Sequence, residues 1–185
     1  MAGPIPLGYA LAVVMLAMSV YCAGRLAAAG LAFGSVERDA DLGHVAMGVA
    51  MAGMLVPRLN PLPRPAWEAI FAAVTVWFAW RATRGHRHVA GHYAQHGLHG
   101  AAMVYMLAAA GTVAGGGHGM SGAMTTVSVP ELAVIFALLL LGCAIWEVDQ
   151  LTAPPPDLLT IAPRLAGLCR AVLSATMGYL LIIMI

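Results

Sequence analysis

Two stretches of the sequence place histidine and methionine side chains along one face of a helix. The offsets of 0, 3, 7 and 10 residues within each stretch span an arc of about 80° at ~100° per residue. The residues that share this spacing are His44, Met47, Met51, Met54, His96, His99, Met103 and Met106. We name these sets the 44–54 column and the 96–106 column. In both, histidine comes first and methionine follows.

Thioether sulfur and imidazole nitrogen together favour a soft metal ion, and Cu(I) fits best. Thioethers bind without releasing protons, so they add no charge in an apolar setting. Zinc would prefer cysteine or a carboxylate beside histidine. Asp41 precedes His44 by three residues and could ligate the ion or orient the imidazole. The columns therefore predict a copper(I) site.

Further candidate ligands lie outside the columns. The glycine-rich stretch GGGHGMSGAM contributes His118, Met120 and Met124 as ligands that capture the ion. His86, His88 and His92 cluster before the second column, where we expect them to be solvated or to contact lipid headgroups.

The two columns belong to a repeated pattern. HVAMGVAMAGML (44–55) aligns with HGLHGAAMVYML (96–107) with identity at six of twelve positions. RAVLSATMGYLL (170–181) is a more divergent third copy. The small residues beside the columns, Gly48 and Gly100 among them, allow close helix approach. The pattern predicts one transmembrane domain of three helical hairpins, over residues 1–62, 63–124 and 125–185.

The composition indicates an integral membrane protein. Apolar residues make up 61% of the 185 residues, charged residues 9%, and the mean hydropathy is +0.85. Soluble domains carry about 25% charged residues. The composition excludes a soluble globular domain and a disordered chain. With a net charge of +1 and no basic tract, it also predicts no nucleic-acid partner.

Six segments could each cross a bilayer as a helix, which makes the predicted fold all-α and polytopic. A crossing needs about 20 mostly apolar residues. The segments, with approximate bounds, are Leu7–Gly24, Leu42–Val56, Ala66–Ala82, His92 or His96 to Ala114, Glu131–Val148 and Leu165–Ile185. The second is short and stops at Pro57. Glu147 and Asp149 end the fifth segment, where we expect both to be solvated.

Arginine sets the expected orientation. Two arginines, Arg58 and Arg64, fall on the side that holds both termini, and the other seven fall on the opposite side. The excess of positive charge places the second side in the cytoplasm. We expect a protein of the cell membrane with both termini outside.

Two alternatives to copper binding are open. His44 with His96 or His99 could hold haem b in an electron-transfer subunit. The methionines could serve packing alone in a non-catalytic assembly subunit, because methionine is a flexible apolar filler. The sequence holds no G-x-S-x-G, P-loop or H-E-x-x-H motif, so we expect no enzyme.

Three stretches resemble a known family. HVAMGVAMAGMLVP (44–57), HGLHGAAMVYM (96–106) and CRAVLSATMGYLLIIM (169–184) look like the family catalogued as domain of unknown function 5134. The likeness covers nearly the whole chain and implies a multi-pass actinobacterial membrane protein. It implies no activity. Leu173 and Leu180 stand where members often have methionine, which weakens a metal role for the last segment.

The residues therefore predict a membrane protein that binds Cu(I) for copper uptake, delivery or sensing. Its expected surroundings are the lipid bilayer and a protein partner for metal hand-over. His118, Met120 and Met124 would capture the ion, the columns would pass it inward, and His44 with His96 would form the exit.

Overall fold

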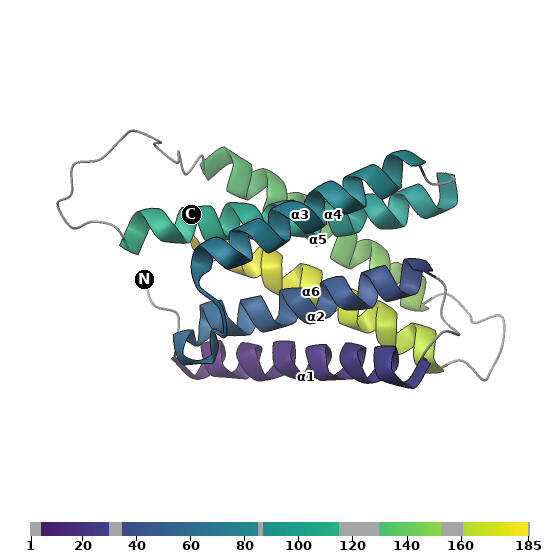
Figure 1. The fold of residues 1–185 in the computed structure, drawn as a ribbon, viewed down its shortest axis with the longest axis horizontal. Coiled ribbons are helices and arrows are strands. Elements are labelled where there is room, and N and C mark those ends of the chain that lie inside the picture. The colour runs from purple at the N-terminus through teal and green to yellow at the C-terminus, as the bar shows by residue number, and fades with distance from the viewer. Residues whose placement is uncertain (1–4, 30–34, 85–86, 115–129, 153–160, 185) are drawn as a thin grey trace.

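Six α-helices form almost all of the chain that a computed structural model describes, which is residues 5–29, 35–84, 87–114, 130–152 and 161–184 (Figure 1). In chain order the helices are α1 (Ile5–Ala29), α2 (Ser35–Leu55), α3 (Arg64–Arg84), α4 (Arg87–Ala114), α5 (Pro130–Thr152) and α6 (Ile161–Met184). The described ranges contain no β-strand. The prediction of an all-α chain is confirmed.

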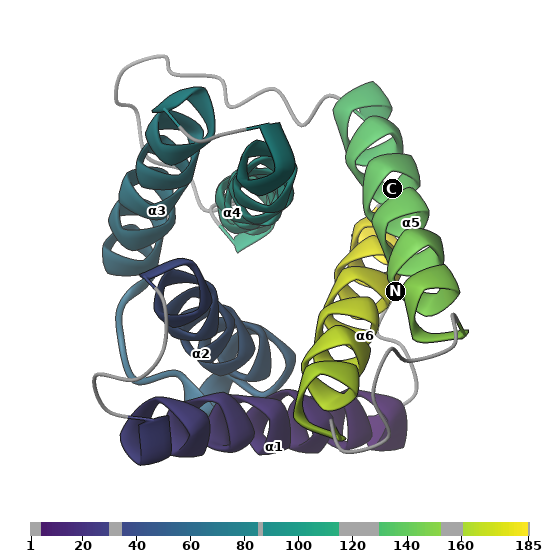
Figure 2. The ribbon, with the colours of Figure 1, turned by 90° about the vertical axis from the view of Figure 1, so that its right-hand side faces the viewer.

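Consecutive helices pack closely in pairs, α1 with α2, α3 with α4 and α5 with α6. The C-terminal ends of α1, α3 and α5 and the N-terminal ends of α2, α4 and α6 lie at one end of the bundle (Figure 1). Viewed end-on, α2, α4 and α6 lie toward the middle, and α1, α3 and α5 lie outside them (Figure 2). The three parallel inner helices therefore place both columns inside the bundle.

The α2 helix ends as the sequence predicts. It stops at Leu55, and the short 3-10 helix η1 (Pro57–Leu59) follows at once. Proline lacks an amide hydrogen and disfavours helical backbone in the residue before it. The connection to α3 is then held by the indole of Trp67, which donates to Oδ1 of Asn60 at 2.7 Å.

Two glycines allow the inner helices to approach their hairpin partners. A β-carbon at Gly48 would lie 2.8 Å from the backbone oxygen of Met15 on α1. One at Gly100 would lie 2.5 Å from Oγ1 of Thr75 on α3. Gly48 and Gly100 are equivalent positions of the repeated pattern, and both meet the preceding helix there. The repeat itself stays a prediction.

The chain is a membrane protein, but the expectation of six spanning helices goes further than the structure does. Of the described residues, three segments are long and apolar enough to cross a bilayer: Pro6–Ala28, Pro130–Thr152 and Leu165–Ile183. All six helices have at least 21 residues, so length is not what separates them. The difference is polar content in α2, α3 and α4.

Much of that polar content is paired within the bundle. Asp39 of α2 lies 3.2 Å from Nη2 of Arg81 on α3, and Asp41 lies 3.4 Å from Nε of Arg25 on α1. By contrast, the outer face of α5 is apolar: Ile135, Ile145 and Val148 are 49–65% exposed. Such a face contacts lipid in a membrane protein.

Candidate metal centre

Helices α1 and α2 bring a thiol, a carboxylate and an imidazole together inside the bundle. One ligand atom from each of Cys22, Asp41 and His44 lies within 4.8 Å of the other two. All three residues are buried. Asp41 and His44 share one face of α2 because they are three residues apart. Cys22 reaches them because α1 runs antiparallel to α2.

The Asp41 carboxylate is only 5% exposed and pairs with Arg25. A buried carboxylate is costly unless it is paired or coordinates a metal. Arg25 supplies that partner, so the charge of Asp41 is already balanced. We therefore regard Cys22 and His44 as the stronger ligand candidates of this group.

The heads of the two columns touch. The rings of His44 and His96 meet edge to face with their centroids 5.0 Å apart. On its other side His96 stacks on Phe78 at 5.1 Å, and its Nε2 lies 3.3 Å from Nε2 of His92. The sequence predicts that His92 is solvated or contacts lipid headgroups. In the structure His92 is half-buried and one side of its ring packs against His96.

One ring nitrogen of His96 lacks a hydrogen-bond partner in the part of the chain that the structure describes. Nδ1 of His96 is buried, in a residue only 1% exposed, and has no hydrogen-bond partner among the described residues. Buried polar atoms in folded proteins are nearly always hydrogen-bonded or bound to an ion. Leaving one unsatisfied costs about 1–3 kcal/mol. This nitrogen is thus the clearest mark of a ligand-binding position in the bundle.

His99 has a different environment, although it belongs to the same column. Its Nδ1–H donates to the backbone oxygen of Gln95 at 2.7 Å, because a carbonyl can only accept. Its Nε2 therefore accepts from the hydroxyl of Ser174, at 2.8 Å. Both nitrogens are used, so the lone pair that would bind a metal is occupied. His99 ties α4 to α6.

Both methionine runs face inward. The residues that are at most 1% exposed and belong to one hydrophobic core are Met47, Met51, Met103 and Met106. Met54 is half-buried against the same core. Met15 of α1 and Met177 of α6 are fully buried there too. The columns thus line the interior, while their role as metal ligands stays a prediction.

His118, Met120 and Met124, predicted to capture the ion, lie outside the described residues. Cys22 is the residue that the sequence analysis missed. It could have been found from the hairpin alone. Cys22 lies seven residues before the end of α1 and His44 lies nine residues after the start of α2, so an antiparallel pair brings them to a similar depth.

Glu147 also departs from expectation. Instead of being solvated, it is 5% exposed and forms a two-point ion pair with Arg170 of α6, at 2.9 and 3.0 Å. The amide of Gln95 donates to the same carboxylate at 3.2 Å. Asp149, two residues nearer the helix end, is exposed as expected. The ion pair with Arg170, 23 residues away in the sequence, offsets the cost of removing the Glu147 carboxylate from water.

Comparison with known proteins gives a family and nothing closer. No curated protein and no solved structure matches the chain. The family model described as a domain of unknown function, DUF5134, matches residues 36–184, which include both columns and all of α3 to α6. The chain therefore belongs to the DUF5134 family of proteins.

Proposed function

We propose that this protein binds Cu(I) inside the membrane, at the junction of the two column heads, for copper uptake, delivery or sensing. The ligands are His44 and His96, with the thiol of Cys22 beside them. The methionine columns extend the soft-ligand path away from this point. The observation that carries the proposal is the buried Nδ1 of His96, which has no partner among the described residues and lies beside His44.

The donor types favour copper(I). Thiol, imidazole and thioether are all ligands that Cu(I) accepts. The group of Cys22, Asp41 and His44 would also suit Zn²⁺, which binds sulfur, nitrogen and oxygen in tetrahedral sites. The buried thioethers favour Cu(I) over Zn²⁺, because zinc sites are built from thiolate, imidazole and carboxylate ligands. Replacing a methionine ligand should therefore weaken the binding of Cu(I) and leave that of Zn²⁺ unchanged.

The contact between the column heads argues against haem b. Two axial histidines must lie on opposite faces of the macrocycle. Here the rings of His44 and His96 meet directly, at 5.0 Å between centroids and 61° between planes. A haem plane could enter only if α2 and α4 moved apart. Copper, which is a single ion, needs no such separation.

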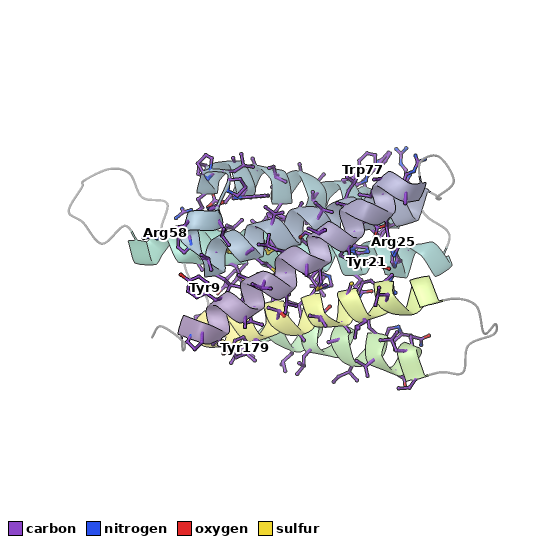
Figure 3. All side chains as sticks on the ribbon, turned by 90° about the horizontal axis from the view of Figure 1, so that it is seen from below. Tyr9, Tyr21, Arg25, Arg58, Trp77 and Tyr179 are labelled. Atoms are coloured by element: carbon purple, nitrogen blue, oxygen red, sulfur yellow. The ribbon has the colours of Figure 1, made fainter. Side chains whose placement is uncertain are left out.

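We further propose that all six helices cross the cell membrane, with α2, α3 and α4 shielded from lipid by their partners. Tyr9 and Tyr179 lie near one end of the bundle, and Tyr21 and Trp77 near the other (Figure 3). Aromatic residues at both ends are typical of membrane–water interfaces. Arg58 lies at the first end and Arg25 at the second (Figure 3). The arginine excess assigns the second end, where the metal centre lies, to the cytoplasm.

The experiment is an anaerobic titration of the purified protein in lipid nanodiscs, with a coloured Cu(I) chelator as competitor. We expect stoichiometric Cu(I) binding. Replacing Met47, the methionine one helical turn from His44, by Leu should weaken Cu(I) binding about tenfold, or ~1.4 kcal/mol, and leave Zn²⁺ binding unchanged. Leucine keeps the volume, so the bundle should stay folded.

Met18→Leu is the matched control, because Met18 packs against the same core but belongs to neither column. It should change neither affinity. If the wild-type chain binds no Cu(I), the proposal fails. If Met47→Leu binds Cu(I) as tightly as wild type, the thioether of Met47 serves packing alone.

A further inference from the structure

A partly open cavity of about 910 Å³ lies between α4 and α5, beside the metal centre. These two helices touch far less than the helices within each hairpin do. Figure 2 shows α4 and α5 set apart, with α6 below the space between them. The cavity is therefore a product of how the second and third hairpins meet.

The lining of the cavity changes from apolar to polar along its length. Leu98, Leu138 and Leu139 line one part. His92, Gln95, Cys143, Glu147, Gln150 and Arg170 line the part nearer the arginine-rich end of the bundle. The polar lining faces the side that we assign to the cytoplasm.

The charges in this lining balance each other. Arg170 binds Glu147 through two contacts, of 2.9 and 3.0 Å, and the amide of Gln95 donates to the same carboxylate. The pair leaves no net positive charge to repel a cation. It also leaves the carboxylate fully engaged, so that Glu147 does not compete for the ion.

His92 connects the cavity to the buried site. Its ring lines the cavity, and its Nε2 lies 3.3 Å from Nε2 of His96. His96 in turn touches His44. One imidazole thus separates the cavity from the residue whose Nδ1 lacks a partner. The thiol of Cys143, which is half-buried, is a second soft ligand on the α5 side of the cavity.

We propose that this cavity is the route by which the copper ion exchanges between the cytoplasmic side and the buried site, with His92 as its first ligand. The inference rests on the proposed function, since it assumes that the site holds copper. It adds a path and a direction of access. The partner it implies is a soluble Cu(I) carrier whose thiols give up or accept the ion at His92.

Two glycines allow the route to be blocked without disturbing the fold. Gly91 and Gly142 line the cavity, and a β-carbon at either would meet nothing within 4 Å. Phenylalanine at these positions fills the cavity from opposite sides. Gly24→Phe is the matched control, because Gly24 on α1 is equally unobstructed and does not line the cavity.

The experiment measures how fast protein loaded with Cu(I) in nanodiscs transfers the ion to a chelator in stopped flow. We expect Gly91→Phe and Gly142→Phe each to slow transfer about tenfold or more, with the amount of copper bound unchanged. Gly24→Phe should transfer at the wild-type rate. His92→Ala, which removes the first ligand and leaves the cavity open, should also slow transfer.

Normal transfer rates in both blocked variants would overturn the route and leave the copper site standing. Loss of bound copper in both variants, with unchanged melting temperature, would also contradict it, because the added rings would then be acting on the site itself. A wild-type chain that binds no copper would overturn the route together with the proposed function.

Discussion

The two columns share a sequence pattern but have different surroundings. His44, the head of the 44–54 column, lies close to the thiol of Cys22 and the carboxylate of Asp41. The head of the 96–106 column, His96, lies against the aromatic ring of Phe78 and the imidazole of His92. One helix thus supplies a setting rich in ligands, and the other supplies contact with the cavity. Repetition of a motif does not repeat its role.

The second position of each column makes the same point. It is Met47 in one column and His99 in the other. Met47 is packed in the hydrophobic core, whereas His99 is fixed by Gln95 and Ser174. A histidine one turn from His96 therefore has its metal-binding lone pair occupied, while His96 does not.

The largest expected effect is a loss of Cu(I) affinity when the histidine at the head of either column is replaced. His44→Leu and His96→Leu should each weaken Cu(I) binding about 100-fold, or ~2.8 kcal/mol. His99→Leu should weaken it by less than about threefold, because its lone pair already accepts a hydrogen bond. Competition titration of the three variants measures this. Equal losses from His96→Leu and His99→Leu would show that the whole column binds as one unit.

A somewhat smaller effect separates the two hairpins. Gly48→Ala places a methyl group against the backbone oxygen of Met15, which cannot move away. Gly100→Ala meets first the hydroxyl of Thr75, which can rotate. We expect a loss of about 2–3 kcal/mol in unfolding free energy for Gly48→Ala and about 1 kcal/mol for Gly100→Ala.

Reversible unfolding in mixed detergent measures both glycine variants. The reverse order of stability would mean that α1 and α2 pack less tightly than α3 and α4.

The smallest expected effect is a change in the stability of the metal-free protein, with opposite signs for two histidines of α4. His96→Leu removes a buried nitrogen that has no partner among the described residues, so the metal-free protein should gain about 1 kcal/mol. His99→Leu leaves the buried hydroxyl of Ser174 without its acceptor and should cost about 1 kcal/mol. Melting temperatures in the presence of a chelator test this. Destabilisation by His96→Leu would indicate a packing role for that ring.

Much of the fold follows from hydropathy and spacing. The number of helices, the end of α2 before Pro57 and the inward-facing methionines all depend on local pattern. Hydropathy alone supports three of the six helices as spans among the described residues, and the other three stay a proposal. Hydropathy judges each helix alone, whereas Asp39 of α2 is paired with Arg81 of α3.

The site was less predictable for the same reason. Which residues of neighbouring helices meet depends on how far each helix is rotated and at what angle it crosses the next. Cys22, His92 and Glu147 all acquire their environment from another helix or another turn, and no local pattern distinguishes them. Spacing could identify His44 and His96 as heads of columns, but not the nitrogen that is left unpartnered.

The central claim is that a copper ion is held by nitrogen and sulfur where the column heads meet. X-ray absorption at the copper edge, on protein loaded with Cu(I), tests it directly. The account predicts nearest neighbours of both kinds, with sulfur at about 2.3 Å, and fewer nitrogen neighbours in His96→Leu. A nearest shell of oxygen and nitrogen alone, unchanged in His96→Leu, would contradict it.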